Sequence, residues 1–359
     1  MERLRGFLID RKADAIVINK EENLQYFSGF RGDDTMLIVS RDDDALLVTD
    51  FRYTEQAKAQ APHYEIAEQK HGLLEKVAEC IESHKYKNIA FEGNALIYDD
   101  YSKLSGILKK SRLNVPVNLS ELRVVKEEEE IRLIRKAAEI GDAAFDDIIK
   151  FIKPGVSEND VAARLENVMR SLGSERPSFT TIVASGERGS LPHGVATEKL
   201  IVDGEFVTMD FGAVYGGYHS DMTRTVAVGR ADDRQREVYD AVLRAQLHGL
   251  AEVKPGASGK HVDAVARDEL SAAGFGENFG HGLGHSLGLE IHEEPRLSPS
   301  STCEALKPNM LVTVEPGVYI AGWGGLRIED TVLVTGTGNE PLTKSTKKLI
   351  EILSDAVPR

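Results

Sequence analysis

Four acidic residues occupy comparable places in two separate stretches of the sequence. Asp210 and Asp221 flank a pair of glycines, and Glu315 and Glu329 flank a second glycine-rich turn. Glycine permits the positive φ that a tight reversal needs, so each stretch is predicted to be a hairpin with its two acids across from one another. The alternative is that these acids lie on solvated strand faces, as most Asp and Glu residues do. Carboxylates gathered in an interior instead protonate, pair with cations or bind metal.

A glycine-rich segment carries further groups that could hold a metal or a substrate. It reads His281-Gly282-Leu283-Gly284-His285-Ser286-Leu287-Gly288, and His292-Glu293-Glu294-Pro295 follows it. The His-x-x-x-His spacing could indicate a helical zinc pair. We reject that interpretation because the glycines are hostile to a helix, and we expect a loop or a strand.

Four carboxylates and one or two imidazoles would form an oxygen-rich ligand set. Arg224 and Arg327 are the obvious bases nearby, and they are too few to neutralise four acids. Without thiolates the set suits two divalent ions of the Mn²⁺ type. Two such ions, four carboxylates and a bridging hydroxide leave the centre nearly neutral. Metals about 3.5–4 Å apart acidify a shared water and supply a nucleophile for a carbonyl carbon, so the predicted chemistry is hydrolysis.

Both hairpins belong to an internal repeat. Lys153-Pro154-Gly155-Val156-Ser157 recurs as Lys254-Pro255-Gly256-Ala257-Ser258, at an offset of 101. Val207-Thr208-Met209-Asp210-Phe211-Gly212 recurs as Val312-Thr313-Val314-Glu315-Pro316-Gly317, at an offset of 105. We infer two similar α+β halves about an approximate twofold axis, which would bring the four carboxylates together.

The repeat occupies the second of two predicted domains, residues 123–359. In residues 1–122, short Val- and Ile-rich runs at 15–18, 36–39, 46–48 and 88–91 alternate with polar stretches, which predicts an α/β domain. From Glu127, apolar residues recur at helical spacing and predict one long amphipathic helix to about Phe151. Ser157 followed by Asp160 predicts the cap of the next helix.

Composition and charge exclude several classes of protein. The 359 residues include 44 Lys+Arg and 58 Asp+Glu, for a formal net charge of −14. Such a chain repels phosphate and has no basic block interleaved with aromatics, so we expect no nucleic-acid partner. Cys80 and Cys303 show no Cys-x-x-Cys spacing, and we find neither a secretory leader nor an apolar run of about 18 residues. We therefore expect a cytoplasmic protein with no membrane partner.

The acids and histidines resemble those of a known family. Their order, Asp, Asp, His, Glu, Glu, with these intervals is similar to that of the pita-bread metallopeptidases, which include methionine aminopeptidase, Xaa-Pro aminopeptidase and prolidase. The resemblance covers essentially the whole chain and is closest to the bacterial Xaa-Pro peptidases. It implies a pita-bread fold for the second domain. It also implies that Asp210 and Asp221 bind one metal ion, that His285 and Glu315 bind the other, and that Glu329 bridges both.

The resemblance also implies roles beside those of the ligands. His292 would contact the scissile carbonyl or shuttle a proton, and His193, in Leu191-Pro192-His193-Gly194, would contact the substrate. Arg327 would orient the site, and His281 would face the substrate or support a ligand. Glu315 would also accept a proton from the nucleophilic water.

The first domain resembles the creatinase-type amino-terminal domain, including Asn23-Leu24-Gln25-Tyr26-Phe27-Ser28-Gly29-Phe30. In relatives this domain builds the dimer and covers the mouth of the active site, so we expect a homodimer. Its presence argues against an ordinary methionine aminopeptidase.

The function implied is hydrolysis of the Xaa-Pro bond at the amino terminus of short peptides with proline at the second position. We favour an Xaa-Pro aminopeptidase with two Mn²⁺ ions, Co²⁺ and Zn²⁺ being the alternative metals. An Xaa-Pro dipeptidase (prolidase) is the main alternative. A metal-free binding module and a creatinase-like amidinohydrolase are further alternatives, and the five filled ligand positions count against both. A dedicated proline pocket is reasonable because an Xaa-Pro bond lacks the N–H that ordinary peptidases bind.

Overall fold

The Val- and Ile-rich runs near the amino terminus form one mixed sheet. The computed structural model describes residues 1–353 and divides the chain into two units, of which the first is Met1–Leu122. Six strands of this unit lie in the order β4-β3-β2-β1-β5-β6. The predicted runs fall on β1, β2, β3 and β5, so those strands are confirmed.

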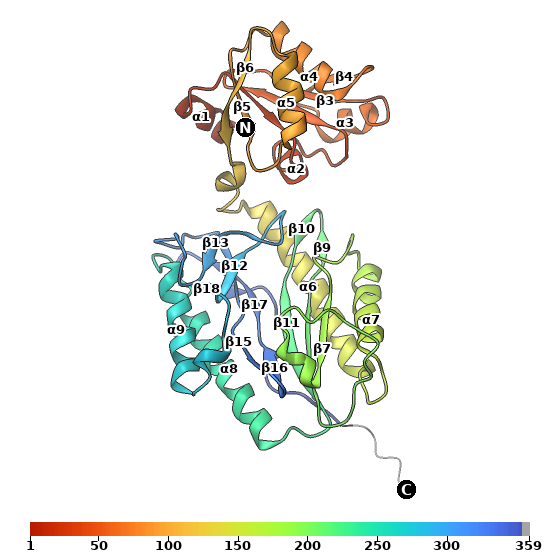
Figure 1. Cartoon of the computed structure of the whole chain (residues 1–359), viewed down its shortest axis with the longest axis vertical. Coiled ribbons are helices and arrows are strands. Elements are labelled where there is room, and N and C mark those ends of the chain that lie inside the picture. Colours follow the sequence, from red (N-terminus) through yellow and green to blue (C-terminus); the bar gives the residue numbers. More distant parts are fainter. Residues whose placement is uncertain (354–359) are drawn as a thin grey trace. The chain divides into compact units, whose positions relative to one another are not determined.

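Strands and helices of the first unit alternate along the chain, except that β2 is followed directly by β3 (Figure 1). Its strands are β1 Ala15–Ile18, β2 Met36–Ser40, β3 Ala45–Thr49, β4 Glu65–Glu68, β5 Asn88–Glu92 and β6 Arg112–Val117. Its helices are α1 Glu2–Asp10, α2 Glu21–Ser28, α3 Thr54–Gln60, α4 Leu73–Ser83 and α5 Tyr98–Ile107, with a 3-10 turn at Leu119–Leu122.

Side chains of β1 point alternately into two cores. Ile16 and Ile18 pack in one core with residues of α1, α2 and α3, such as Leu4. Ala15 and Val17 pack in the other core with residues of α4 and α5. Helices therefore cover both faces of the sheet, which confirms the predicted α/β architecture.

The second unit, Arg123–Arg359, holds the duplicated part of the sequence. Positions 354–359 of the predicted second domain lie outside the described residues. The first half contains α6 Glu128–Phe151, α7 Glu158–Ser171, β7 Ile182–Ser185, η2 Gly186–Ser190, β8 Phe206–Phe211, β9 Val214–Tyr215, β10 Tyr218–His219 and β11 Met222–Val228. The second half contains α8 Asp233–Glu252, α9 Gly259–Ala272, η3 Gly276–Asn278, β12 Gly284–Ser286, β13 Glu293–Leu297, β14 Leu311–Val314, β15 Gly317–Ile320, β16 Gly324–Arg327, β17 Asp330–Val334, β18 Asn339–Pro341 and β19 Glu351–Ile352.

Both halves begin with two packed helices joined at corresponding residues. Helix α6 begins after Glu127 and ends at Phe151, as predicted. Ser157 caps α7, with Asp160 returning a bond to its backbone, and Ser258 caps α9 at the corresponding place. Figure 1 shows the α6–α7 pair and the α8–α9 pair on opposite sides of the strands. Each pair has its own apolar core, so the predicted duplication is confirmed.

Hairpins follow the helices in each half, and their registers differ. The ladders β14–β17 and β15–β16 share one register that places Glu315 opposite Glu329, as predicted. In the first half Asp210 pairs with Thr223, and the continuing register places Asp221 opposite Gly212. Asp210 and Asp221 are therefore diagonal neighbours on one face. The prediction that they lie directly opposite one another is wrong by two residues of register.

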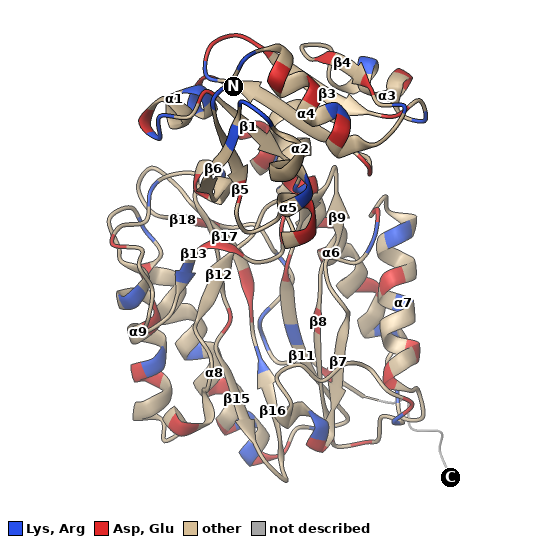
Figure 2. Cartoon of the chain, turned by 45° about the horizontal axis from the view of Figure 1, so that its top comes forward, with Lys and Arg blue, Asp and Glu red and all other residues tan. Residues whose placement is uncertain are grey.

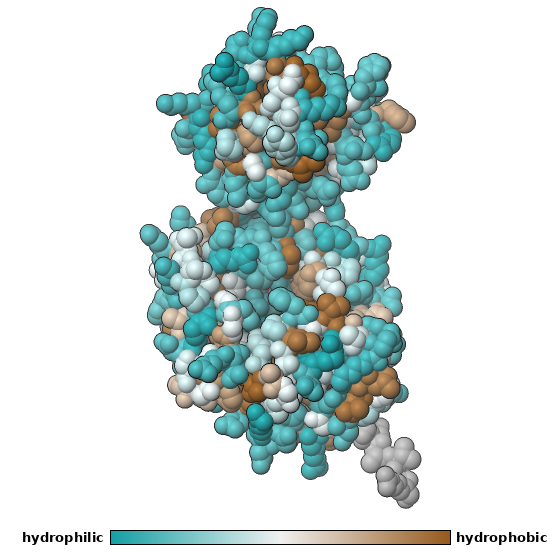
Figure 3. Space-filling model, viewed as in Figure 1, coloured by the Kyte–Doolittle hydropathy of each residue, from teal (hydrophilic) through white to brown (hydrophobic). Residues whose placement is uncertain are grey.

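The surface carries mixed charge. In Figure 2, lysines and arginines alternate with acids along α7 and α9. The face seen in Figure 3 is mostly hydrophilic and carries separate hydrophobic patches. Among residues 1–353 no helix is both long and apolar enough to cross a membrane.

Candidate metal centre

All nine residues that the sequence predicts for the site border one cavity in the second unit. Its volume is about 980 Å³. The predicted residues on its wall are His193, Asp210, Asp221, His281, His285, His292, Glu315, Arg327 and Glu329. Since they come from loops and strands far apart in the sequence, the fold brings them together.

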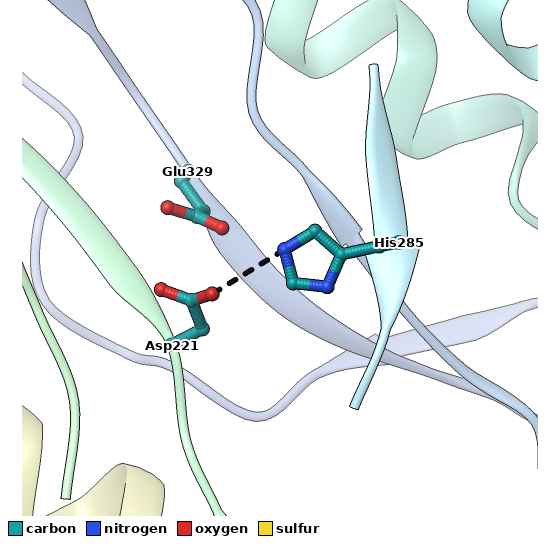
Figure 4. Close-up of side chains that lie close together, drawn as sticks. All are labelled: Asp221, His285 and Glu329. Atoms are coloured by element: carbon teal, nitrogen blue, oxygen red, sulfur yellow. Dashed lines mark ion pairs between the residues drawn. The ribbon is translucent and has the colours of Figure 1, made fainter. Parts of the chain in front are cut away.

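Asp221, His285 and Glu329 form the tightest cluster. One ligand atom of each lies within 4.8 Å of the others. Figure 4 shows the three side chains pointing toward one another, each from a different strand or strand end. His285 Nε2 lies 3.5 Å from Asp221 Oδ2 and 3.5 Å from Glu315 Oε1. Four of the five predicted ligands thus surround one small volume.

Asp210, the fifth predicted ligand, is held beside this cluster by a cation. Its Oδ2 lies 2.5 Å from Arg327 Nη2. Its other oxygen, Oδ1, is buried with no hydrogen-bond partner among the described residues, and so is Glu329 Oε1. Buried carboxylate oxygens without a donor are costly, and a bound cation would remove that cost. The donor set, with carboxylates and one imidazole but no thiolate, fits hard divalent ions.

Burial and mutual repulsion keep these acids from ionising freely. Burial, and then the charge of Glu329, raise the pKa of Asp221 well above its ordinary value. The pKa of Glu329 is also raised well above its ordinary value by burial and by Glu315. Burial raises the pKa of Glu315 to about 7. A divalent cation would favour the ionised forms of all three acids, so the cluster is electrostatically suited to metal.

His285 has the protonation state of a metal ligand. Its Nδ1 lies 3.0 Å from the carbonyl oxygen of Ser286, which can only accept, so Nδ1 is the donor. Burial lowers the pKa of His285 to about 3, so the ring is neutral at physiological pH. Nε2 therefore presents a lone pair toward Asp221 and Glu315, and the bond at Nδ1 fixes the ring orientation.

Threonines that sequence reasoning missed position the acids. Thr223 Oγ1 donates to Glu329 Oε2 at 2.6 Å, and Thr313 Oγ1 donates to Glu315 Oε1 at 3.1 Å. Thr313 is two residues before Glu315, which places both on one strand face. The repeated Val-Thr-x-acid element contained this signal for Thr313.

Arg327 connects the acids to His281 through Tyr319, a second residue that the sequence did not reveal. Arg327 Nη1 donates to the Tyr319 hydroxyl at 2.8 Å and to the Pro192 carbonyl at 3.2 Å. The same hydroxyl lies 2.9 Å from His281 Nε2. His281 is thus linked to the acids through other side chains, and Arg327 is placed to orient Asp210.

His292 and His193 take different positions at the cavity. The His292 ring packs edge-on against His285, with centroids 4.5 Å apart. Burial lowers the pKa of His292, so its ring can accept a proton only weakly at neutral pH. His193 is exposed on the loop after η2 and lines the cavity, and it forms no hydrogen bond or ion pair with a predicted ligand among residues 1–353.

A buried ion cluster supports the segment that carries His292. The next residue, Glu293, is buried and accepts from Lys126 Nζ at 2.9 Å, with Arg123 Nη2 at 3.4 Å. Arg123 also contacts Glu290. The start of the second unit therefore fastens both ends of the short turn that precedes β13.

Arg224 does not face the ligands, although the sequence suggested it as a base near them. Its guanidinium pairs with the buried Asp330 at 2.7 Å and donates to the backbone oxygen of Glu329. Of these two arginines, Arg327 alone pairs with a predicted ligand. Arg224 is engaged by Asp330 instead, so it does not serve as the counter-charge for the acids that the sequence suggested.

A duplicated α+β domain that gathers carboxylates and a neutral imidazole at one cavity defines a metal-dependent hydrolase of the pita-bread fold. The family comparison identifies it further. Residues 132–336 match the model of metallopeptidase family M24, and residues 1–125 match the creatinase/prolidase N-terminal domain. The chain belongs to metallopeptidase family M24.

Relatives span the whole chain. A Bacillus subtilis protein described as an uncharacterized peptidase is 47% identical, over 98% of this chain and 99% of its own. The structure of an Xaa-Pro dipeptidase from Bacillus anthracis is 45% identical, with a TM-score of 0.94 and 98% of each chain covered. That of an X-Pro aminopeptidase from Thermotoga maritima is 38% identical, with a TM-score of 0.91 and coverage of 98% and 99%.

Proposed function

We propose that this metallopeptidase hydrolyses the Xaa-Pro bond of short peptides with two divalent ions, of the Mn²⁺ type, held by Asp210, Asp221, His285, Glu315 and Glu329. The observation that carries the proposal is the cluster of Asp221, His285 and Glu329, with Glu315 and Asp210 beside it at the same cavity and two buried carboxylate oxygens that lack a donor among the described residues. Bound divalent ions would acidify water and polarise a carbonyl. The names of the relatives support the substrate class.

The residues of the chain itself have distinct parts in this proposal. Glu315 lies at the cavity with Oε1 3.5 Å from His285 Nε2, where it is placed to accept a proton at a carboxylate oxygen and return it. His292 lies beside His285 at the cavity, where a ring N–H can donate to the reacting carbonyl oxygen or the ring can shuttle a proton. Arg327 orients Asp210, and His193 and His281 border the space where the peptide would bind.

Arg296 favours dipeptides as the substrates. It is the cross-strand partner of His285 and lines the same cavity. Its only ion pair within the described part of the chain is a 3.9 Å contact with Glu294, and 42% of its side chain is exposed. A guanidinium in this position can bind the carboxylate that a dipeptide places directly after the scissile bond. We therefore favour an Xaa-Pro dipeptidase over the aminopeptidase that the sequence suggested.

The Xaa-Pro aminopeptidase remains the second candidate because of the size of the cavity. Its volume of about 980 Å³ is at the upper end of the range of roughly 300–1,000 Å³ found for ligand pockets. The cavity therefore has room for residues beyond a dipeptide.

One assay separates the two candidates. Metal-stripped protein is supplied with Mn²⁺, Co²⁺ or Zn²⁺ and given Ala-Pro beside Ala-Pro-Ala. Turnover of Ala-Pro alone supports the dipeptidase, and turnover of Ala-Pro-Ala supports the aminopeptidase. If neither peptide is cleaved with any of the three metals, the proposed function is wrong.

Arg296→Gln tests the carboxylate contact directly. We expect KM for Ala-Pro to rise about tenfold or more, since the lost charge-assisted bond contributes about 1.5–3 kcal/mol, while kcat changes little. KM for Ala-Pro-amide, which has no carboxylate, should be the same in both proteins. An equal loss on both substrates would contradict this role for Arg296.

We also propose that the protein is a cytoplasmic homodimer. Both cysteines are free thiols, as a reducing compartment requires, and the first unit matches the domain through which relatives are expected to pair. Light scattering of the full chain checks the dimer, and a mass equal to one chain would contradict it.

A further inference from the structure

We propose that Glu158 is a positioning residue that holds the His193 loop, residues 186–199, against the wall of the active-site cavity. This inference rests on the proposed function, since it requires His193 to contact the peptide. Glu158 does not line the cavity. It would act on the reaction only through the loop.

Glu158 is an unusually well-bonded buried acid. It is the first residue of α7, and none of its side chain is exposed. Its Oε1 accepts from the backbone N–H and the hydroxyl of Ser185, both at 2.8 Å. Its Oε2 accepts from the hydroxyl of Thr197 at 2.7 Å, from the Thr197 N–H at 3.1 Å and from Arg188 Nε at 3.0 Å. Charge-assisted bonds of this kind are among the strongest in proteins.

These donors come from both ends of the loop. Ser185 and Arg188 precede His193, and Thr197 follows it. Arg188 Nη2 also donates to the Val195 carbonyl at 2.6 Å, and the Val195 N–H donates to the His193 carbonyl at 2.8 Å. One carboxylate therefore gathers both flanks of His193 and fixes the path of the backbone between them.

The gathered loop rests on strand β16 without any intervening side chain. A Cβ at Gly189 would lie 2.7 Å from the Gly325 carbonyl oxygen, and a Cβ at Gly324 would lie 2.6 Å from the Gly186 oxygen. Strand β16 ends at Arg327, whose Nη1 donates to the Pro192 carbonyl beside His193. The loop is thus held from behind by Glu158 and from the cavity side by Arg327.

Glu158→Gln tests the inference, because it removes the charge and replaces one acceptor oxygen with an amide donor. We expect kcat/KM for an Xaa-Pro peptide to fall about 10- to 100-fold, mainly through KM, as a displaced binding group predicts. Bound metal should stay at the wild-type level. In a His193→Ala background the same substitution should change kcat/KM less than about twofold, since both act through one contact.

Trypsin cleavage after Arg188 and Lys199 provides a readout that needs no activity. A loosened loop opens more often, so Glu158→Gln should be cut there faster than the wild type under native conditions. The matched control is Glu82→Gln, which removes a carboxylate that accepts three backbone N–H groups from residues 109–111 of the first unit. It should leave cleavage at Arg188 and the peptidase activity unchanged.

The outcomes separate this inference from the proposed function. Wild-type protein without turnover of any Xaa-Pro peptide overturns the proposed function, and unchanged cleavage after Arg188 overturns the role of Glu158 in holding the loop. Losses that add in the double variant overturn the link to His193. If Glu158→Gln does not fold, Arg188→Met replaces it with metal content, kinetics and cleavage after Lys199 as readouts. It removes the Arg188 bonds to Glu158 and to the Val195 carbonyl but leaves the Ser185 and Thr197 bonds to Glu158, so we expect smaller losses in the same direction.

Discussion

At the scale of single residues, the site depends on two acids that each have a hydrogen-bond donor from the described residues on only one of their two carboxylate oxygens. Asp210 receives Arg327 on Oδ2, and Glu329 receives Thr223 on Oε2. The second oxygen of each acid is buried without a donor among residues 1–353. The protein side chains thus fix each carboxylate while leaving one oxygen available, which is the arrangement that a metal ligand needs.

Asp221→Asn should abolish metal-dependent hydrolysis. The amide is a weaker ligand and cannot supply the negative charge that divalent ions need at this cluster. We expect kcat/KM to fall at least about 10³-fold and the bound metal, measured by elemental analysis, to drop. Wild-type protein purified under the same mild conditions is the control. Full activity with a full complement of metal would contradict the ligand assignment.

Residue spacing pointed to the four acids and to the histidines of the glycine-rich segment, and the family resemblance added His193. Neither revealed the residues that support them, for identifiable reasons. Thr313 was inside the repeated element and could have been found by the two-residue period of a strand. Arg296 and Tyr319 could not be found in that way. Arg296 reaches the cavity because β13 pairs with β12, and Tyr319 because β15 pairs with β16. Both pairings depend on registers that single-sequence patterns do not contain.

At the scale of elements, glycines let the ligand-bearing strands approach closely. Strand β12 carries His285, and the residue before it, Gly284, lies against β14. A Cβ at Gly284 would come within 2.0 Å of the Thr313 carbonyl oxygen. The His285 N–H donates to the Thr313 hydroxyl at 3.0 Å, so the close approach of the two strands also fixes the position of the His285 backbone.

Gly284→Ala should therefore displace β12 and weaken metal binding. Overpacking against backbone costs about 1–3 kcal/mol or more, and the backbone carbonyl cannot move away as a flexible side chain can. Thermal unfolding and metal content measure the effect. Gly280→Ala in the same segment is the control, since nothing lies within 4 Å of a Cβ there. Equal behaviour of the two variants would show that the strand contact does not matter.

The sequence predicted the turns of both hairpins but the register of only one. Their turns were predicted correctly, with Gly216 and Gly217 between β9 and β10 and Gly322 between β15 and β16. The placement of Glu315 opposite Glu329 was also correct, whereas Asp210 and Asp221 are diagonal. A shift of this size keeps both acids on the buried face, so hydrophobic patterning could not distinguish the two registers.

At the scale of the whole molecule, the duplicated unit brings together acids that repel one another, and bound metal would reduce this repulsion. Neither half alone contains the full set, since Asp210 and Asp221 come from the first half and His285, Glu315 and Glu329 from the second. Assembling the halves without metal brings acids together against their charge. The free energy of unfolding of metal-stripped protein should therefore depend on the ionisation of these acids.

Glu315→Gln makes that dependence measurable. The pKa of Glu315 is raised to about 7 in the folded chain, above its ordinary value near 4.5. Its protonated form therefore favours folding below pH 4.5, and this contribution is lost as pH rises through 7. Glutamine has no such loss. Without metal, we expect the variant and the wild type to unfold at similar temperatures at pH 5, and the variant to unfold at a higher temperature at pH 8.

Bound metal should reverse the order of the two unfolding temperatures at pH 8, so that the wild type unfolds at a higher temperature than Glu315→Gln. With Mn²⁺ at 100 times its dissociation constant, the wild type gains about 2.7 kcal/mol per independent site, while the variant has lost a ligand and gains less. Calorimetry from pH 5 to pH 8, with and without Mn²⁺, tests both halves of this expectation. Glu304→Gln, at an exposed position, is the control: its unfolding temperature should follow that of the wild type at every pH, with and without Mn²⁺. If Glu315→Gln is less stable than the wild type at pH 8 without metal, repulsion among these acids is not what the bound ions relieve.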